Sequence, residues 1–196
     1  MSQDSPWSVV LCSSLLFALS ASSASSASAQ ALRFATHKDY SSGYGAAAIA
    51  VGDLNGDGVR DLAVANNFDG TVAVLLGNPD GTFQPARIVY LGPNNQPKSA
   101  ALADFNRDGK LDLAVANPAA NTVTILPGNG DGSFQPRIDF LAGESPRDIA
   151  IADFDGDAKP DLAVANGDVG HPESSKNYVS VLLNKCARPK REAVRH

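Results

Sequence analysis

The sequence predicts an all-β fold, a partial β-propeller of three four-stranded antiparallel blades. The first observation is a repeat: residues 50–66, 101–117 and 150–166 align without gaps, and a period near 50 residues is typical of solenoids and propellers. The second is the local pattern after residue 30, where short runs of Val, Ile, Leu and Ala alternate with Gly, Asn, Asp and Pro and show no helical period. Four short strands per period match one propeller blade.

Each repeat gives the same order of elements. A first apolar strand, such as AAAIAV, is followed by an aspartate-rich loop and then by the strand DLAVAN. A β-branched run predicts the third strand, and a Gly-Asn hairpin signal with a fourth strand follows in the first two repeats. The third strands are expected at 71–76, 121–126 and 178–183, the hairpins at 77–83 and 128–134, and the fourth strands at 86–91 and 137–142.

The repeats occupy residues 30–184, with units at about 42–91, 92–142 and 143–184. Phe34 precedes the first loop at the same distance at which Phe134 precedes the third, which predicts an extra N-terminal strand at 34–40. Three blades are fewer than the roughly four to eight that close a propeller. We therefore expect either an open arc, with its sheet edges exposed or covered by a partner, or a homodimer in which two copies exchange N-terminal strands.

The N-terminus predicts export. The apolar run 8–21 is followed by Ala27-Ser28-Ala29, so residues 1–29 are expected to be a signal peptide cleaved after Ala29, although residues 1–7 lack the usual Lys or Arg. The run is too short to span a bilayer, and the protein is expected to be secreted or on the cell surface. Cleavage would leave Cys186 as the single cysteine, unable to form an internal disulfide. The basic tail 185–196 is expected to be disordered.

Charge argues against nucleic-acid binding, since the formal net charge is -5 and no basic face is evident. Residues 30–184 hold 11 basic and 19 acidic side chains, and ten of those acids lie in the three aspartate-rich loops. Crowded carboxylates repel one another unless a cation offsets them. The acids therefore point to metal binding.

The loops share the pattern D-x-[DN]-x-D-x-x-x-D, with oxygen-bearing side chains at positions one, three, five and nine. Alternating oxygens can wrap a hard cation such as Ca²⁺, with a backbone carbonyl from position seven. Up to three Ca²⁺ ions are expected. The expected ligands are Asp53, Asn55, Asp57, Val59 and Asp61; Asp104, Asn106, Asp108, Lys110 and Asp112; and Asp153, Asp155, Asp157, Lys159 and Asp161.

Other interpretations of the loops are weaker. Asp, Asn and Gly also favour solvated turns that bind nothing, but three copies in register with strands on both sides favour a metal. An EF-hand is excluded because its twelfth position, a bidentate Glu, is Val64, Val115 or Val164 here. Gly58 and Gly109 at position six suit a turn with positive φ.

The string D-x-N-G-D-G-x-x-D-L-A-V-A-N, followed by V-x-V-L-L-G-N-x-D-G-x-F, resembles the FG-GAP repeat, also called the VCBS-type repeat, over residues 34–184. The resemblance implies blades like those of the integrin α-subunit head. It also implies calcium loops between strands, away from the ligand-binding face. Repeat three departs from the pattern with Ala158 at position six and Pro160 before Asp161.

No catalytic residues are expected. His37, His171 and His196 lie in no motif, and the aspartates already have metal-ligand positions. The preferred function is an exported calcium-binding module for protein or glycan binding or adhesion, with a structural metal. The alternative is a fragment or accessory domain of a secreted polysaccharide-active or other enzyme.

Overall fold

The computed structural model describes residues 32–93, 95–167 and 177–186. The chain divides into two units, residues 1–37 and 38–196, and every strand of the described residues belongs to the second. No described residue is helical, and the described part of the chain therefore contains no helix that could span a membrane. The all-β prediction is confirmed.

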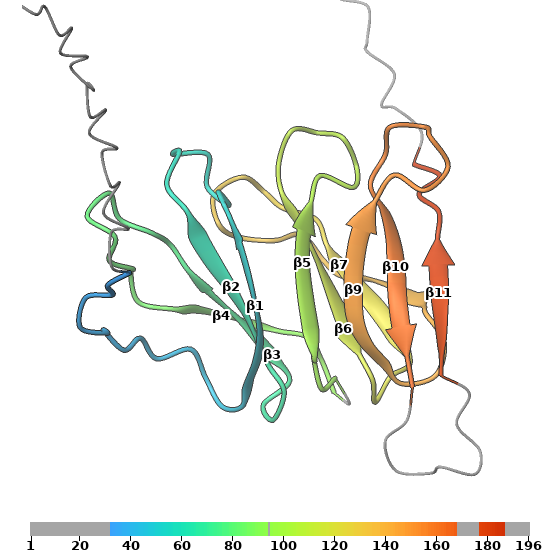
Figure 1. Cartoon of the computed structure of the whole chain (residues 1–196), viewed down its shortest axis with the longest axis horizontal. Helices are drawn as coiled ribbons and strands as arrows, with labels where there is room; N and C mark the ends of the chain where they lie inside the picture. The colour runs from blue at the N-terminus through green and yellow to red at the C-terminus, as the bar shows by residue number, and fades with distance from the viewer. Residues whose placement is uncertain (1–31, 94, 168–176, 187–196) are drawn as a thin grey trace, which may run out of the picture. The chain divides into compact units, whose positions relative to one another are not determined.

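In the described part of the chain, eleven strands form three antiparallel sheets of four, four and three strands (Figure 1). Sheet one has the order β1-β2-β3-β4 and sheet two the order β5-β6-β7-β8, so each is a simple meander. Sheet three has the order β9-β10-β11 along the chain. The bounds are β1 Ala46–Gly52, β2 Asp61–Asn66, β3 Thr71–Leu75, β4 Arg87–Tyr90, β5 Ser99–Ala103, β6 Asp112–Asn117, β7 Thr122–Leu126, β8 Ile138–Leu141, β9 Pro146–Ala152, β10 Asp161–Asn166 and β11 Tyr178–Leu182.

The three DLAVAN segments become the second strands β2, β6 and β10, as the repeat predicts. Every residue of β6 is buried, because sheet two is covered on both faces. A strand covered on both faces has a nearly continuous apolar sequence rather than an alternating one. The closing asparagines of these strands are also buried, and in β6 and β10 the side-chain amide donates to a hydroxyl on the next strand: Asn117 to Thr124 (2.8 Å) and Asn166 to Ser180 (2.9 Å).

The first strands β1, β5 and β9 follow one another side by side (Figure 1). One apolar cluster lies between sheets one and two and includes Val74 and Leu113; a second lies between sheets two and three and includes Ile125 and Leu162. A smaller cluster lies on sheet one, where Tyr40 and Phe83 pack against Val64 and its neighbours. Each blade therefore buries apolar side chains against the blades beside it, as the units of other repeat proteins do.

The predicted N-terminal strand at 34–40 is wrong, because the structure has no strand over residues 32–43. The fourth strands β4 and β8 form by pairing with the third strands that precede them in the chain, β3 and β7. Among the described residues, no third strand precedes residues 34–40 for them to pair with in this way. The strand could not form within its own repeat.

Several predictions concern residues outside the described ranges. The signal peptide at 1–29, most of the loop at 167–177, His171, His196 and residues 187–196 of the basic tail are among them. These stay predictions. The first residues of the tail are described. Lys185 there forms an ion pair with Asp155 (Nζ–Oδ2 2.7 Å) and so contacts loop three.

Candidate metal centres

Each aspartate-rich loop connects the first strand of a sheet to the second. The aspartate at position one directly follows β1, β5 or β9, and the aspartate at position nine begins β2, β6 or β10. The loop ends are therefore fixed by two paired strands. We call residues 53–61 loop one, 104–112 loop two and 153–161 loop three.

The carboxylate at position one is surrounded by backbone amides of its own loop. In loop one, Oδ1 of Asp53 accepts hydrogen bonds from Gly56 (2.7 Å) and Asp57 (3.2 Å), and Oδ2 accepts one from Gly58 (2.8 Å). The Gly58 amide is the main reason that the pKa of Asp53 lies below its ordinary value. In loop three, Asp153 accepts the same set of three bonds, from Gly156, Asp157 and Ala158 (2.7, 3.1 and 2.9 Å).

Positions three and five form two successive turns. In loop one, Oδ1 of Asn55 accepts the amide of Asp57 (3.1 Å), and Oδ1 of Asp57 accepts the amide of Val59 (2.8 Å). The same pair of bonds recurs in loop two, at 2.8 and 2.9 Å, and in loop three, at 3.3 and 3.1 Å. Asx turns of this kind hold side-chain oxygens close to the backbone. The ligand order that the sequence predicts is therefore compatible with the turns.

Position nine is different, because its carboxylate is buried and its two oxygens bond in opposite directions. In loop two, Oδ2 of Asp112 accepts the amide of Phe105 (2.9 Å), and Oδ1 accepts the amide of Gly128 after β7 (2.8 Å). Loop one repeats this arrangement with Asp61, and loop three with Asp161. Position nine thus ties the loop to the end of the third strand.

Two of these buried aspartates have opposite pKa shifts. Burial raises the pKa of Asp112 above its ordinary value, and its backbone hydrogen bonds offset this only in part. The amides of Asn184 and Phe154 instead lower the pKa of Asp161. Loop two is covered by sheet three at Phe105, whereas the equivalent Phe154 of loop three is exposed. The deeper burial of loop two therefore explains why the pKa of Asp112 is raised while that of Asp161 is lowered.

Glycine is required after two of the third strands. A Cβ on Gly128 would lie 2.1 Å from the carbonyl oxygen of Leu111, and one on Gly77 would lie 2.3 Å from that of Arg60. In sheet three the matching residue is Asn184, whose amide makes the same bond to position nine (2.7 Å). These donors lie 16 or more residues from the position-nine aspartates, and no motif in the sequence marks them as their partners.

Positive φ occurs at two positions in each loop. At position six it is found in Gly58 (83°), Gly109 (88°) and Ala158 (60°), as the sequence predicts. At position four it is found in Gly56 and Gly156 but also in Arg107 (63°), where the residue type does not predict it. Loops two and three therefore each hold one non-glycine residue in the left-handed region, where a Cβ is unfavourable.

Loop three brings three carboxylates together. Oxygen atoms of Asp153, Asp155 and Asp161 lie within 4.8 Å of one another, an arrangement that could hold a metal ion. Hard cations such as Ca²⁺ bind carboxylate oxygens at about 2.3–2.6 Å, so oxygens this close can share one ion. Loops one and two carry an asparagine at position three and offer an amide oxygen there instead.

Two lysines offset charge in loop three. Lys159 contacts Asp157 (Nζ–Oδ2 2.8 Å), and this hydrogen bond is the main cause of the lowered pKa of Asp157. Lys185 contacts Asp155, and that hydrogen bond is the main cause of the raised pKa of Lys185. A metal ion would have to compete with both ammonium groups. The four carboxylates of loop three thus do not simply strengthen binding relative to the other loops.

Comparison with known proteins finds a match to the model of one protein family. The model described as FG-GAP-like repeat matches residues 53–115 and 104–164, which together span more than half of the chain. Each match begins at position one of a loop and ends inside the second strand of the following blade. No curated protein matches the chain.

Replacing Ala158 by glycine should stabilise the fold and tighten calcium binding at loop three. The left-handed conformation of Ala158 costs on the order of 1 kcal/mol, which glycine avoids. Thermal unfolding with and without calcium measures both effects. The control is Ala152→Gly in the exposed end of β9, which should destabilise the fold. A weaker calcium response in Ala158→Gly would contradict the role assigned to the turn.

Replacing Asp112 by asparagine should destabilise the fold even without metal. Its two oxygens satisfy buried amides of Phe105 and Gly128, and an unsatisfied buried group costs about 1–3 kcal/mol. Urea unfolding in EGTA measures this loss. Glu144→Gln, which removes the same charge at an exposed site, should change little. Equal stability of the two variants would show that position nine acts only as a metal ligand.

Proposed function

Because the chain belongs to the FG-GAP-like repeat family, we propose that it is an exported, calcium-stabilised binding module whose metal is structural. The observation that carries the proposal is the group of carboxylate oxygens from Asp153, Asp155 and Asp161 in loop three. Loops one and two repeat its hydrogen-bond framework with the same ligand positions. Oxygen ligands in this number suit Ca²⁺ better than a softer metal.

A structural role for the metal follows from where the loops lie. Each loop joins two paired strands, and its buried position-nine carboxylate also fixes the end of the third strand. An ion held at positions one, three, five and nine would therefore stabilise three strands of one blade at once. In each loop the ion would also offset repulsion among three or four carboxylates.

A binding role rather than catalysis is supported by an exposed aromatic pair at the end of sheet one that lies opposite loop one. Tyr44, just before β1, and Phe68, in the turn from β2 to β3, are both 71% exposed, and their ring centroids are 5.2 Å apart. Exposed aromatic pairs are favourable contacts for proteins and for sugar rings. This pair lies at the strand ends remote from loop one, and the family resemblance implies a ligand-binding face away from the calcium loops.

The same aromatic pair also suits the second candidate, an accessory domain of a secreted polysaccharide-active enzyme. Binding to a glycan array without turnover would favour the module. Release of reducing sugar by the purified chain would favour an enzyme. Loss of glycan binding in Phe68→Ala, with Leu141→Ala as an equally conservative surface control, would assign binding to the pair.

Calcium should stabilise the exported protein. Extracellular sites bind at roughly 10⁻⁴–10⁻³ M, and a site with a dissociation constant of about 0.1 mM gains about 1.4 kcal/mol at 1 mM calcium. Three such sites should raise the melting temperature by several degrees. Calorimetric titration should give up to three ions per chain, and Mg²⁺ at equal concentration should do much less. A melting curve unchanged by EGTA would refute the calcium assignment.

A further inference from the structure

Every sheet presents the same apolar positions toward the next one, and in sheet three these positions are uncovered. They are position two of the loop and two alternate residues of the third strand. In sheet two they are buried by sheet three: Phe105, Val123 and Ile125 are 9%, 0% and 7% exposed. The equivalents in sheet three, Phe154, Val179 and Val181, are 48%, 64% and 52% exposed.

Among the residues that the structure places, the β11 edge of sheet three also has no strand paired with it. β3 and β7 each pair with a fourth strand, whereas β11 pairs only with β10 among the described residues. Free backbone groups along such an edge are a template for a further strand. Sheet three therefore offers hydrogen-bonding groups and apolar side chains together.

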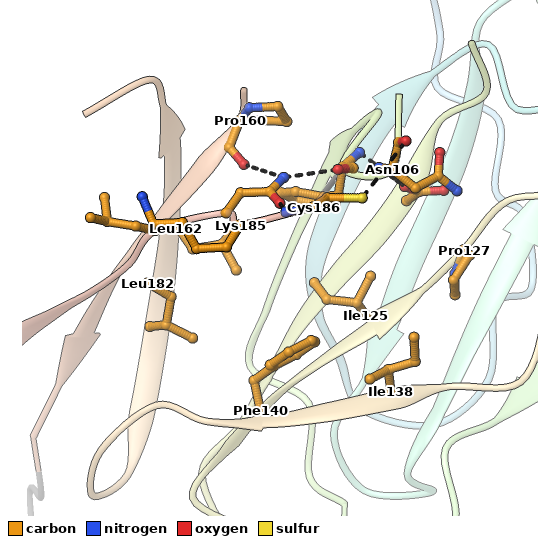
Figure 2. Close-up of a pocket in the computed structure, with 14 residues that line it drawn as sticks. Asn106, Ile125, Pro127, Ile138, Phe140, Pro160, Leu162, Leu182, Lys185 and Cys186 are labelled. Atoms are coloured by element: carbon orange, nitrogen blue, oxygen red, sulfur yellow. Dashed lines mark hydrogen bonds between the residues drawn. The ribbon is translucent and has the colours of Figure 1, made fainter. Parts of the chain in front are cut away.

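A cavity of about 430 Å³ lies between sheets two and three. Ile125 and Phe140 line one side, and Leu162 and Leu182 line the other (Figure 2). Between sheets one and two, Phe134 from the hairpin after β7 packs against the core. Residues 184–196, which follow β11, contain no Phe, Tyr or Trp to do the same for sheet three.

The N-terminal segment carries the missing phenylalanine. Residues 34–53 align with residues 134–153 at a constant offset, so Phe34 corresponds to Phe134 and Tyr40 to Phe140. Phe34 is 88% exposed. The segment therefore has an exposed ring at the sequence position that fills the cavity between the preceding pair of sheets.

The residues that follow this segment already have the backbone of a linker between blades. Gly43 (φ 118°) and Gly45 (φ 81°) have positive φ, as do Gly143 (99°) and Ser145 (52°) between β8 and β9. The carbonyl of Gly45 accepts the amide of Asn67 (2.8 Å), as that of Ser145 accepts the amide of Gly167 (3.2 Å). In repeat three this linker follows a fourth strand of the preceding blade.

Tyr40 also lies where a fourth strand of a preceding blade would lie. Its ring packs edge-on against Phe83, with centroids 5.3 Å apart. Between sheets one and two, Val89 of the fourth strand β4 belongs to the same cluster as Phe134, the equivalent of Phe83. Sheet one thus holds Tyr40 at the position that Val89 of a fourth strand occupies between sheets one and two.

We propose that residues 34–40 of a second copy pair antiparallel with β11 and place Phe34 in the cavity. The register follows from β7 and β8, where Val123 faces Phe140 and Thr124 faces Asp139. It sets Val179 opposite Tyr40 of the second copy and Ser180 opposite its Asp39. The Thr124 hydroxyl donates to Asp139, and Ser180 would donate to Asp39 in the same way.

A second copy fits better than the chain's own segment. Sheet two separates sheet three from sheet one, against which Tyr40 packs, and packed sheets are about 10 Å apart. To reach sheet three, the chain's own segment would have to cross two of these sheet-to-sheet distances. Six residues extend at most about 20 Å, so crossing would use all of residues 34–40. No residue of the segment would then remain to pair along β11. Between two copies, the segment leads directly from β11 of one into sheet one of the other.

Two copies can exchange segments reciprocally. Each would cover the open face of the other's sheet three with its own sheet one, where Ile49 and Val51 of β1 are each 59% exposed. Two identical contacts related by a two-fold axis close the assembly. The pair would contain six blades, within the range of closed propellers.

The test is the mass of the exported protein in solution at about 10 µM, with calcium. We expect twice the mass of one chain, and hydrogen exchange should show protected amides across β11. Phe34→Ala should weaken the dimer at least about tenfold, because a buried aromatic anchor contributes strongly to association. Leu141→Ala, which removes a side chain 84% exposed on β8, should leave the dimer intact.

A second variant tests the other side of the contact. Val181→Lys sets a lysine opposite Lys38 of the second copy and should also give monomers with an unchanged circular dichroism spectrum. Mixing it with Phe34→Ala should restore dimers, since one contact of the mixed pair is then intact.

Four outcomes would overturn the proposal. They are a monomeric wild type with unprotected β11, a monomer in which β11 and residues 34–40 are both protected, open polymers in place of dimers, and a dimer unaffected by Phe34→Ala. The melting response to calcium is measured separately, so failure of the dimer leaves the calcium assignment standing.

Discussion

The buried carboxylate at position nine is the constraint on which each blade depends. In loop two, Asp112 accepts one amide from the start of its loop and another from Gly128 beyond β7. It therefore joins residues that are far apart in the sequence across the end of one sheet. A buried carboxylate needs such partners, because burial without hydrogen bonds is costly. The requirement explains why glycine follows β3 and β7, where a Cβ would collide with the backbone of the loop.

With position nine fixed, the remaining loop can fold around the carboxylate at position one. Backbone amides at positions four to six donate to it, which requires the left-handed backbone of residues such as Gly56 and Gly58. Positions three and five then close two turns through their own oxygens. The loop framework is thus built from protein hydrogen bonds. A cation would add to it by offsetting the carboxylate charge.

The repeated pattern made most of the fold predictable. Strand-like runs at fixed distances from the loop aspartates located the strands, because every repeat folds the same local sequence into the same meander. The prediction that failed was the strand at 34–40, which has no neighbouring third strand among the described residues to pair with. Arg107 was missed because its positive φ contradicts its local preference. The Lys185–Asp155 pair was missed because it joins residues that only the folded sheet brings together.

The same side chain has different surroundings in different repeats, and this shows where stability resides. Val123 and Val179 occupy equivalent positions on β7 and β11, yet one is fully buried and the other largely exposed. The sequence of a single repeat therefore cannot decide whether its apolar face is core or surface; the next blade decides it. In such an array the total stability is approximately the sum of the stabilities of the repeats and of the interfaces between neighbours. Within the described residues, the two end blades each contact a single neighbouring blade, so part of their apolar surface stays exposed.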